Sequence, residues 1–436
     1  MKKLEFLMPA GNLEKLKYAF AYGADAVYAG VPMFSLRARE NQFSRETLEE
    51  AVEYTHNLGK KIYFTANIYA HNAKIKPFME AFKKMETLKP DAYIMSDPGL
   101  INMVRKEYPN AEIHLSVQAN NTNWAQVKFW QEIGIKRVIL SREISLREIK
   151  EIHENCPEME LEFFIHGAIC MAYSGRCLLS NYMAHRDPNQ GTCAHSCRWE
   201  YKVYKNDIEG NDLYENTGRP EDYTELKGEF YLEEKERQGN LLPIDEDEFG
   251  TYIMNSRDMC LLDYIEELRD AGIVSFKVEG RSKTINYIAG VGRAYRQAID
   301  AVEAGEKYNT KELINELFAI SNRGYIPGFI TGDVGASSIY YEKNSELKEE
   351  DFVGIIREYD ENNKLALIEV KNRIDLGQTL RLISLNKSFE FKLEKIIDMK
   401  GENKTEAHGG SFNVWINMSD NPGEFALLRK NYINLI

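Results

Sequence analysis

Four cysteines fall within 28 consecutive residues near the middle of the chain, and their spacing points to metal chemistry. They form the pattern Cys170-x6-Cys177-x15-Cys193-x3-Cys197. Four thiolates can hold an iron–sulfur cluster or a tetrahedral zinc ion. Structural zinc sites usually pair their cysteines two to four residues apart at both ends, and only Cys193 and Cys197 are spaced in that way. The spacing therefore favours an iron–sulfur cluster, with 4Fe–4S expected, and leaves zinc and four metal-free buried thiols as alternatives.

The length of the chain argues against a disulfide scaffold. Disulfide frameworks are typical of small secreted domains, whereas this chain has 436 residues and six cysteines. Metal binding or redox chemistry in the cytoplasm suits such cysteines better. The other two, Cys156 and Cys260, stand apart in the sequence, and we expect them to be core residues.

The first 300 residues alternate between short β-rich runs and amphipathic helical stretches. Eight strand–helix units over roughly 250–300 residues match the size and rhythm of a (β/α)8 barrel, and we expect this domain to span residues 1–335. A doubly wound open sheet has the same local pattern and is the alternative. The predicted strands are 4–10, 26–30, 61–67, 92–96, 112–118, 137–143, 161–167 and 275–280.

Polar side chains gather at the ends of these predicted strands, where the active site of such a barrel lies. Asp97 and Ser141 have a simpler explanation, because both suit the N-cap of a following helix. We expect His166, Lys277 and Glu279 to be catalytic residues that move protons. The candidate substrate-binding residues are Arg37, Arg39, Ser116, Gln118 and Arg281. Further polar strand-end residues, to which the sequence assigns no role, are Asn67, Ser96, Arg142 and Glu143.

The three candidate arginines indicate that the ligand is an anion. Arg37 and Arg39 follow the second predicted strand, and Arg281 would approach the same mouth of the barrel from the eighth. Guanidinium groups suit bidentate binding of a carboxylate or a phosphate, so we expect a di-acid or a phosphate there. The alternative for Arg37 and Arg39 is a solvated surface pair.

A long insertion, residues 168–255, separates the seventh predicted strand from the eighth. Its first part carries the four cysteines, and its second part is strongly acidic. Residues 205–250 hold 15 Asp and Glu against 5 Lys and Arg, in a chain whose net charge is −13. The net negative charge argues against strong non-specific binding of nucleic acid. Because the acidity is local, the rest of the chain can still present a basic surface to a specific RNA.

From about residue 350 the pattern changes to alternating apolar and polar residues, separated by turns such as DENNK and KGENK. Period-two alternation is typical of β-strands with one buried face. We therefore expect residues 345–436 to form a small all-β barrel domain, with a β-sandwich as the alternative.

Several functional classes have no support in the sequence. No apolar run approaches the ~18–20 residues that span a bilayer, and the start, MKKLEFLMPAGNLEKL, lacks the features of a signal peptide. A cytoplasmic location without a membrane partner is therefore expected. The motifs HExxH, GxSxG and the P-loop are absent, so a standard zinc protease, serine hydrolase or NTPase is not indicated.

Four blocks of sequence resemble a known family. They are MPAGNLEKLKYAFAYGADAVYAG, FSLRARENQFS, EFFIHGAICMAYSGRCLLS and SFKVEGR. Together they resemble peptidase family U32, the collagenase-like peptidases, from about residue 4 to residue 330, and the part beyond 350 looks like the family's C-terminal β-barrel.

The resemblance implies a function in RNA modification. The chain looks most like the members that convert wobble uridine of tRNA to 5-hydroxyuridine without molecular oxygen, with prephenate as co-substrate. It implies that the cluster is held by the four cysteines, and that tRNA meets the protein through its anticodon loop. An unpaired base can stack on an aromatic side chain, and Tyr173 and Trp199 flank the cysteines, although packing roles suit both as well.

Two other functions stay open at this point. The first is the proteolysis of collagen-like substrates that the family name describes, which would make the chain a hydrolase. The second is a non-catalytic assembly subunit that pairs with another family member or with itself, with the acidic insertion as its contact surface.

Overall fold

The structure is a computed structural model. It describes residues 3–36, 42–198, 256–332, 334, 338, 349–410 and 413–431, and between residues 204 and 252 only the backbone of five short strands. Those strands are β8 (Tyr204–Asn206), β9 (Tyr223–Glu225), β10 (Phe230–Glu233), β11 (Leu241–Glu246) and β12 (Thr251–Tyr252). Most of the acidic insertion therefore lies outside the described residues.

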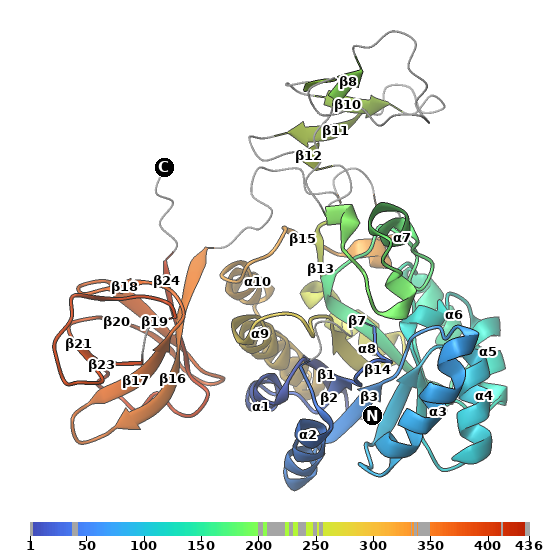
Figure 1. Ribbon diagram of the computed structural model, residues 1–436, viewed down its shortest axis with the longest axis horizontal. Coiled ribbons are helices and arrows are strands. Elements are labelled where there is room, and N and C mark those ends of the chain that lie inside the picture. The colour runs from blue at the N-terminus through green and yellow to red at the C-terminus, as the bar shows by residue number, and fades with distance from the viewer. Residues whose placement is uncertain are drawn as a thin grey trace.

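Eight parallel strands close into a barrel, which confirms the predicted (β/α)8 fold (Figure 1). The barrel closes because β14 pairs with β1 on one side and with β7 on the other. A doubly wound sheet would instead leave two open edges. All eight predicted strands are present: β1 (Glu5–Ala10), β2 (Ala26–Gly30), β3 (Lys61–Thr65), β4 (Ala92–Met95), β5 (Ile113–Leu115), β6 (Arg137–Ile139), β7 (Glu160–Ala168) and β14 (Ile273–Val278).

Helices cover the outside of this barrel, and polar residues at the strand ends start several of them. Asp97 caps its helix as expected, because its Oδ1 accepts the backbone N–H groups of Gly99 and Leu100. Ser141 does not cap a helix: its hydroxyl donates to Asn120, and the cap is Ser145. The helices are α1 (Leu13–Ala21), α2 (Arg45–Asn57), α3 (Asn72–Glu86), α4 (Pro98–Glu107), α5 (Trp124–Glu132), α6 (Leu146–Asn155), α7 (Leu179–Ala184), α8 (Ile265–Asp270), α9 (Ile285–Ala304) and α10 (Thr310–Phe318).

Two short strands extend the sheet beyond the barrel at β7. β13 (Asp258–Cys260) pairs antiparallel with the end of β7, and β15 (Tyr325–Ile326) pairs parallel with β13. The chain therefore returns from the insertion directly onto the strand that it left. This fixes the start of the cysteine-rich part against the barrel.

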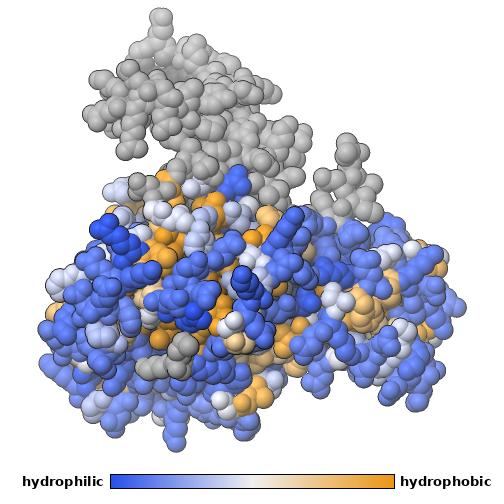
Figure 2. Space-filling model, turned by 180° about the vertical axis from the view of Figure 1, so that it is seen from behind, coloured by the Kyte–Doolittle hydropathy of each residue, from blue (hydrophilic) through white to orange (hydrophobic). Residues whose placement is uncertain are grey.

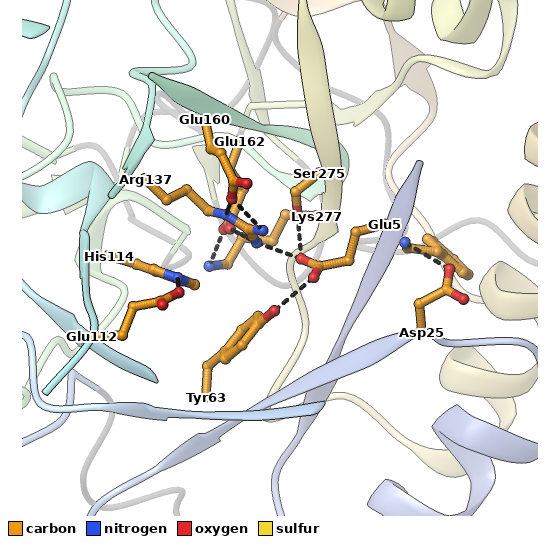
Figure 3. A network of polar contacts seen from close by, with 11 residues as sticks. Glu5, Asp25, Tyr63, Glu112, His114, Arg137, Glu160, Glu162, Ser275 and Lys277 are labelled. Carbon is orange, nitrogen blue, oxygen red and sulfur yellow. Dashed lines mark hydrogen bonds and ion pairs between the residues drawn. The ribbon is translucent and has the colours of Figure 1, made fainter. Parts of the chain in front are cut away.

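Paired charges fill the barrel interior near the N-terminal ends of its strands (Figure 3). Arg137 forms ion pairs with Glu5 and, at 3.4 Å, with Glu162, while Lys277 Nζ lies 2.6 Å from the other oxygen of Glu162. Tyr63 donates to Glu5 at 2.6 Å. Since each buried charge has an opposite partner, this layer is neutralised internally and holds Lys277 in a fixed position.

The C-terminal domain is a curled antiparallel sheet beside α1, α9 and α10, which confirms the predicted small all-β fold (Figure 1). Its strand order is β20-β19-β24-β16-β17-β23-β21, and β18 pairs separately with β22. The strands are β16 (Glu350–Asp360), β17 (Leu365–Val370), β18 (Ile374–Asp375), β19 (Thr379–Ile383), β20 (Ser388–Lys392), β21 (Ile396–Asp398), β22 (Glu406–Ala407), β23 (Val414–Asn417) and β24 (Leu427–Asn431). Among the described residues, no helix has the length and apolar character needed to cross a membrane.

Candidate functional site

A cavity of about 350 Å³ opens at the C-terminal ends of the barrel strands. Its lower walls come from β2, β3, β7 and β14, and its upper wall from residues 170–198, which we call the cysteine segment. Of the predicted site residues, it brings together Ser116, Gln118, Lys277, Glu279, Arg281, Cys170, Cys177, Cys193 and Cys197. Residues far apart in the sequence thus meet where the active site of such barrels lies.

The four cysteines all line this cavity as free thiols. Burial raises the pKa of the Cys197 thiol; the Arg198 guanidinium opposes this shift, and the thiols of Cys170, Cys193 and Cys177 add to it. No three His, Cys, Asp or Glu side chains within the described part of the chain converge closely enough to ligate a single ion.

Hydrogen bonds from the barrel hold the first half of the cysteine segment. Glu143, at the end of β6, accepts the backbone N–H of Ser174 at 3.1 Å and its hydroxyl at 3.3 Å. Gly175 has a φ of +76°, and a Cβ there would lie 2.1 Å from the carbonyl oxygen of Gln118. Glycine is therefore needed at this position both for its backbone conformation and for the close approach of the barrel.

Further bonds order the second half of the segment around its own thiols. Arg186 donates from Nε to the carbonyl of Thr192 at 3.0 Å and from Nη2 to the carbonyl of Cys193 at 3.2 Å. The backbone N–H of His195 points to the Cys193 sulfur at 3.4 Å. N–H groups near the sulfurs are among the factors that set the potential of an iron–sulfur centre.

Two cationic side chains from β14 and its end form the floor of the cavity. Lys277 Nζ lies 4.5 Å from the centre of the Tyr28 ring, and burial lowers the pKa of this ammonium despite its bond to Glu162. Arg281 donates from Nη1 to the hydroxyl of Thr65 at 2.7 Å and also bonds the carbonyl of Leu36. These contacts fix both cations at the cavity wall.

A third cation, Arg142, has no role assigned from its sequence position, yet it also lines the cavity. Its guanidinium carbon lies 3.8 Å from the centre of the Phe164 ring, and its side chain is 10% exposed. Its buried Nε has no hydrogen-bond partner, and its nearest acidic oxygen, on Glu279, is 4.0 Å away. A buried guanidinium with an open donor is poised for an anionic ligand.

The carboxylate of Glu279 is the acidic group on the cavity wall. Its Oε2 lies 3.5 Å from the Tyr28 hydroxyl, and its backbone carbonyl accepts the Tyr287 hydroxyl at 2.7 Å. A Cβ at Gly167 would approach the Cβ of Glu279 to 2.9 Å. Because Gly167 has no side chain, the ends of β7 and β14 can come together, and this close approach sets the position of Glu279.

Ser116 and Gln118 form the wall next to β5. The Ser116 hydroxyl accepts the side-chain amide of Asn67 at 3.1 Å and the backbone N–H of Gln118 at 3.3 Å. Tyr69 in turn donates to the backbone carbonyl of Gln118 at 2.6 Å. These neutral donors and acceptors can form hydrogen bonds with the polar edge of a bound molecule.

His166 does not reach the cavity, contrary to the expectation that it is catalytic. The pairing of β7 with β14 shifts by one residue between Phe164 and His166, so the imidazole turns outward to the aromatic rings of α9. Its Nδ1 lies 3.3 Å from the Tyr295 hydroxyl. Burial lowers the pKa of His166 to about 3, which keeps the ring neutral at physiological pH.

Some predicted residues lie elsewhere. Arg37, Arg39 and Trp199 are outside the described residues. Cys156 is buried, as expected of a core residue. Cys260 is partly buried, and its sulfur lies 3.4 Å from the Tyr295 hydroxyl on the side of β7 away from the cavity.

Comparison with known proteins assigns this chain to a family. Residues 11–339 match the family model "Peptidase family U32", and residues 348–429 match that of its C-terminal domain. The chain is 45% identical to tRNA hydroxylation protein P of Escherichia coli (strain K12), over 99% of this chain and 98% of that protein. It is 42% identical to the Haemophilus influenzae protein of the same name, over 99% and 97%. A solved U32 peptidase, Mk0906, matches 42% of this chain and 78% of its own with 14% identity and a TM-score of 0.34. The chain belongs to peptidase family U32.

Proposed function

We propose that this protein hydroxylates tRNA, converting wobble uridine to 5-hydroxyuridine with an iron–sulfur cluster and a carboxylate co-substrate, prephenate. The names of the two relatives, which match almost the full length of the chain, support the class of reaction. The observation that carries the proposal is the meeting of four thiols and four cationic side chains, Arg142, Arg198, Lys277 and Arg281, around one cavity.

The donor set at the cavity fits a cluster better than a single zinc ion. The four thiolates of one zinc lie within about 4 Å of each other, because each Zn–S bond is about 2.3 Å. Only Cys193 and Cys197 have the close sequence spacing that structural zinc sites use at both ends, although all four thiols share the cavity. In an iron–sulfur cluster the cysteines bind different irons, which suits more widely spaced thiols. Cys170, Cys177, Cys193 and Cys197 would hold the cluster, which supplies one-electron transfer when bound.

The cations around the cavity suit a small di-acid. Arg142 has an unused buried donor, and Lys277 lies over the same Phe164 ring at 5.4 Å. Charge-assisted bonds from such groups are stronger than those between neutral groups. In this proposal Arg142 and Arg281 bind the carboxylates of the co-substrate, and Lys277 neutralises charge on the floor.

In this proposal Glu279 accepts or returns a proton at the cavity wall. Its Oε2 lies near the Tyr28 hydroxyl and Arg142, so the carboxylate is oriented from two sides. Hydroxylation replaces the hydrogen on a ring carbon of uracil, so a nearby carboxylate can accept the proton that leaves this carbon. His166 has no part in this proposal, because it lies behind β7.

The experiment is complementation in an E. coli strain that lacks its own tRNA hydroxylation protein and is grown without oxygen. Mass spectrometry of the nucleosides from total tRNA would measure 5-hydroxyuridine. We expect the wild-type chain to restore it, and the double variant Cys193→Ser, Cys197→Ser to fail. Cys156→Ser is the matched control, because this thiol is buried away from the cavity, and it should restore the nucleoside fully.

Either of two results would overturn the proposal. One is failure of the wild-type chain to restore the nucleoside although the protein accumulates. The other is full restoration by the double cysteine variant. A strain that cannot make prephenate tests the co-substrate separately, since hydroxylation should stop there and return when prephenate is supplied.

A further inference from the structure

Exposed apolar side chains are concentrated in one short stretch of the cysteine segment. Of the 13 large apolar residues that are exposed in the described part of the chain, five lie between residues 171 and 183. Single exposed apolar residues are normal, but a group of this kind marks a binding surface. We call this group the rim; it consists of Met171, Tyr173, Leu178, Tyr182 and Met183. Figure 2 shows apolar side chains in patches in the upper part, the centre and near the lower edge of the coloured surface.

The rim is continuous with the mouth of the cavity. Met171 and Tyr173 both line the cavity, yet they are 45% and 54% exposed. Tyr182, on α7, is 80% exposed. The bonds of Glu143 to Ser174 fix the loop that carries Tyr173, so the rim starts from an ordered loop. A molecule bound on the rim would therefore reach directly into the site.

The segment that carries the rim has a net positive charge in a chain that is acidic overall. Residues 170–198 contain three arginines, at 176, 186 and 198, and a single acid, Asp187, whereas the whole chain has a net charge of −13. The neighbouring helix α3 has no acidic residue in its first turn, and its Lys74 bonds Gln190 of the segment at 2.7 Å. Arg176 is exposed and close enough to Tyr69 to lower the pKa of that phenol, which burial raises.

Exposed aromatic rings beside cationic side chains match one class of ligand. Single-stranded RNA offers unstacked bases for the rings and phosphates for the cations. A fully paired RNA would present its phosphates but would hide the faces of its bases. The surroundings of the rim therefore favour a loop over a helix.

We propose that the rim binds the anticodon loop of the tRNA substrate, with Tyr173 and Tyr182 stacking on unpaired bases and Arg176 contacting the backbone. The inference rests on the proposed function for the identity of the RNA and adds the surface that receives it. Stacking on Tyr173 would hold a base at the mouth of the cavity, from which the target base enters.

The test measures the affinity of the full-length protein for a fluorescent anticodon stem-loop RNA by anisotropy. We expect Tyr173→Ala and Tyr182→Ala each to weaken binding at least about fivefold, because each removes one stacked base. Tyr173→Phe and Tyr182→Phe keep the ring and should bind within about twofold of wild type. Phe129→Ala is the matched control, since Phe129 is 53% exposed on α5 and does not line the cavity.

The results separate this inference from the proposed function. Unchanged affinity in both alanine variants would overturn the rim as the RNA surface, and so would equal losses in the alanine and phenylalanine variants. If the alanine variants bind RNA normally but fail to restore 5-hydroxyuridine in cells, the rim serves a protein partner and the inference is wrong while the function stands. If the wild-type chain restores no 5-hydroxyuridine, the function itself fails, whatever the affinities.

Discussion

Arg142 shows how a candidate site residue can escape prediction from sequence although its strand-end position is visible there. It follows β6 as one of several polar strand-end residues, and its neighbours Ser141 and Glu143 have structural bonds to Asn120 and Ser174. Only the three-dimensional arrangement separates them, because Arg142 alone of the three lines the cavity with an unused donor. Because Glu143 follows Arg142 directly in the sequence, nothing local indicates that this guanidinium has an open donor.

Replacing Arg142 by Met should weaken binding of the co-substrate and leave the fold intact. Loss of a charge-assisted bond to a carboxylate costs about 1.5–3 kcal/mol, so the KM for prephenate should rise about 10- to 100-fold. The melting temperature should change little, because the variant relieves the unpartnered buried Nε and in exchange loses only the contact with the Phe164 ring and the long, 4.0 Å ion pair with Glu279. Steady-state kinetics and thermal unfolding would measure both effects. Arg147→Met, on the exposed side of α6, should change neither, and a large loss of stability in Arg142→Met would show that the arginine is mainly structural.

His166 should make the protein sensitive to acid instead of driving catalysis. Its pKa is about 3 in the folded protein, against an ordinary value of 6.5 for histidine, so the unfolded chain binds more protons between these values. The stabilisation is complete above the unfolded value and is lost as the pH falls below it. Between pH 7 and pH 5 the wild type should lose about 2 kcal/mol of stability relative to His166→Gln.

Thermal unfolding at the two pH values would measure this difference. His408→Gln is the control, since this imidazole is exposed on the C-terminal domain. At pH 7 His166→Gln should still restore 5-hydroxyuridine in cells. Loss of the nucleoside from a folded His166→Gln protein would return His166 to a catalytic role.

At the scale of elements, the order of strands could be predicted because each is a short buried run bounded by helical stretches. All eight barrel strands and the change to β structure near residue 350 follow from such patterns. The orientation of individual side chains could not be predicted where the pairing shifts. One extra residue between Phe164 and His166 turns the imidazole outward, and no local signal in LEFFIHG marks this shift. The convergence of the cysteine segment on the cavity depends on contacts with β6 and β5 that the sequence does not reveal.

Gly175 should be essential for the placement of the cysteine segment. Its Cβ in Gly175→Ala would lie 2.1 Å from the Gln118 carbonyl oxygen, so the segment must move away from the barrel. We expect iron content and cellular hydroxylation to fall at least about tenfold, with little change in the unfolding of the barrel. Gly59→Ala is the matched control, because Gly59 also has a positive φ, +64°, but nothing lies within 4 Å of its Cβ position.

The control variant isolates the effect of space from that of backbone strain. Gly59→Ala should cost about 1 kcal/mol in stability and leave iron content and hydroxylation unchanged. Equal effects of the two variants on iron content would mean that the contact with Gln118 does not position the thiols.

At the scale of the whole molecule, the C-terminal domain is joined to the barrel by buried polar contacts. The hydroxyl of Tyr22, which caps the C-terminus of α1, lies within 3.1 Å of the carbonyls of Ile383 and Phe425. The Arg429 side chain is fully buried, donates to Asn286 of α9 at 2.7 Å and pairs with Glu350 at 3.4 Å. Such directional contacts fix the orientation of the two domains, so the C-terminal domain is held in one position relative to the cavity.

Arg429→Ala should therefore uncouple the two domains. The substitution leaves the Glu350 carboxylate, which is only 9% exposed, with Arg381 as its remaining ion-pair partner, and it opens a cavity against α9. Breaking a buried pair in this way costs about 3–5 kcal/mol. Calorimetry should show the single unfolding transition of the wild type split into two, with the C-terminal domain melting first. Arg357→Ala is the matched control: it removes the ion pairs of a more exposed arginine with Glu14 of α1 and with Glu369, and it should cost less than about 1 kcal/mol without splitting the transition. Because the cysteines and the cavity belong to the barrel, iron content should survive in Arg429→Ala. A simultaneous fall of hydroxylation would then assign the fixed C-terminal domain a role in holding the RNA, whereas unchanged hydroxylation would make it a structural support.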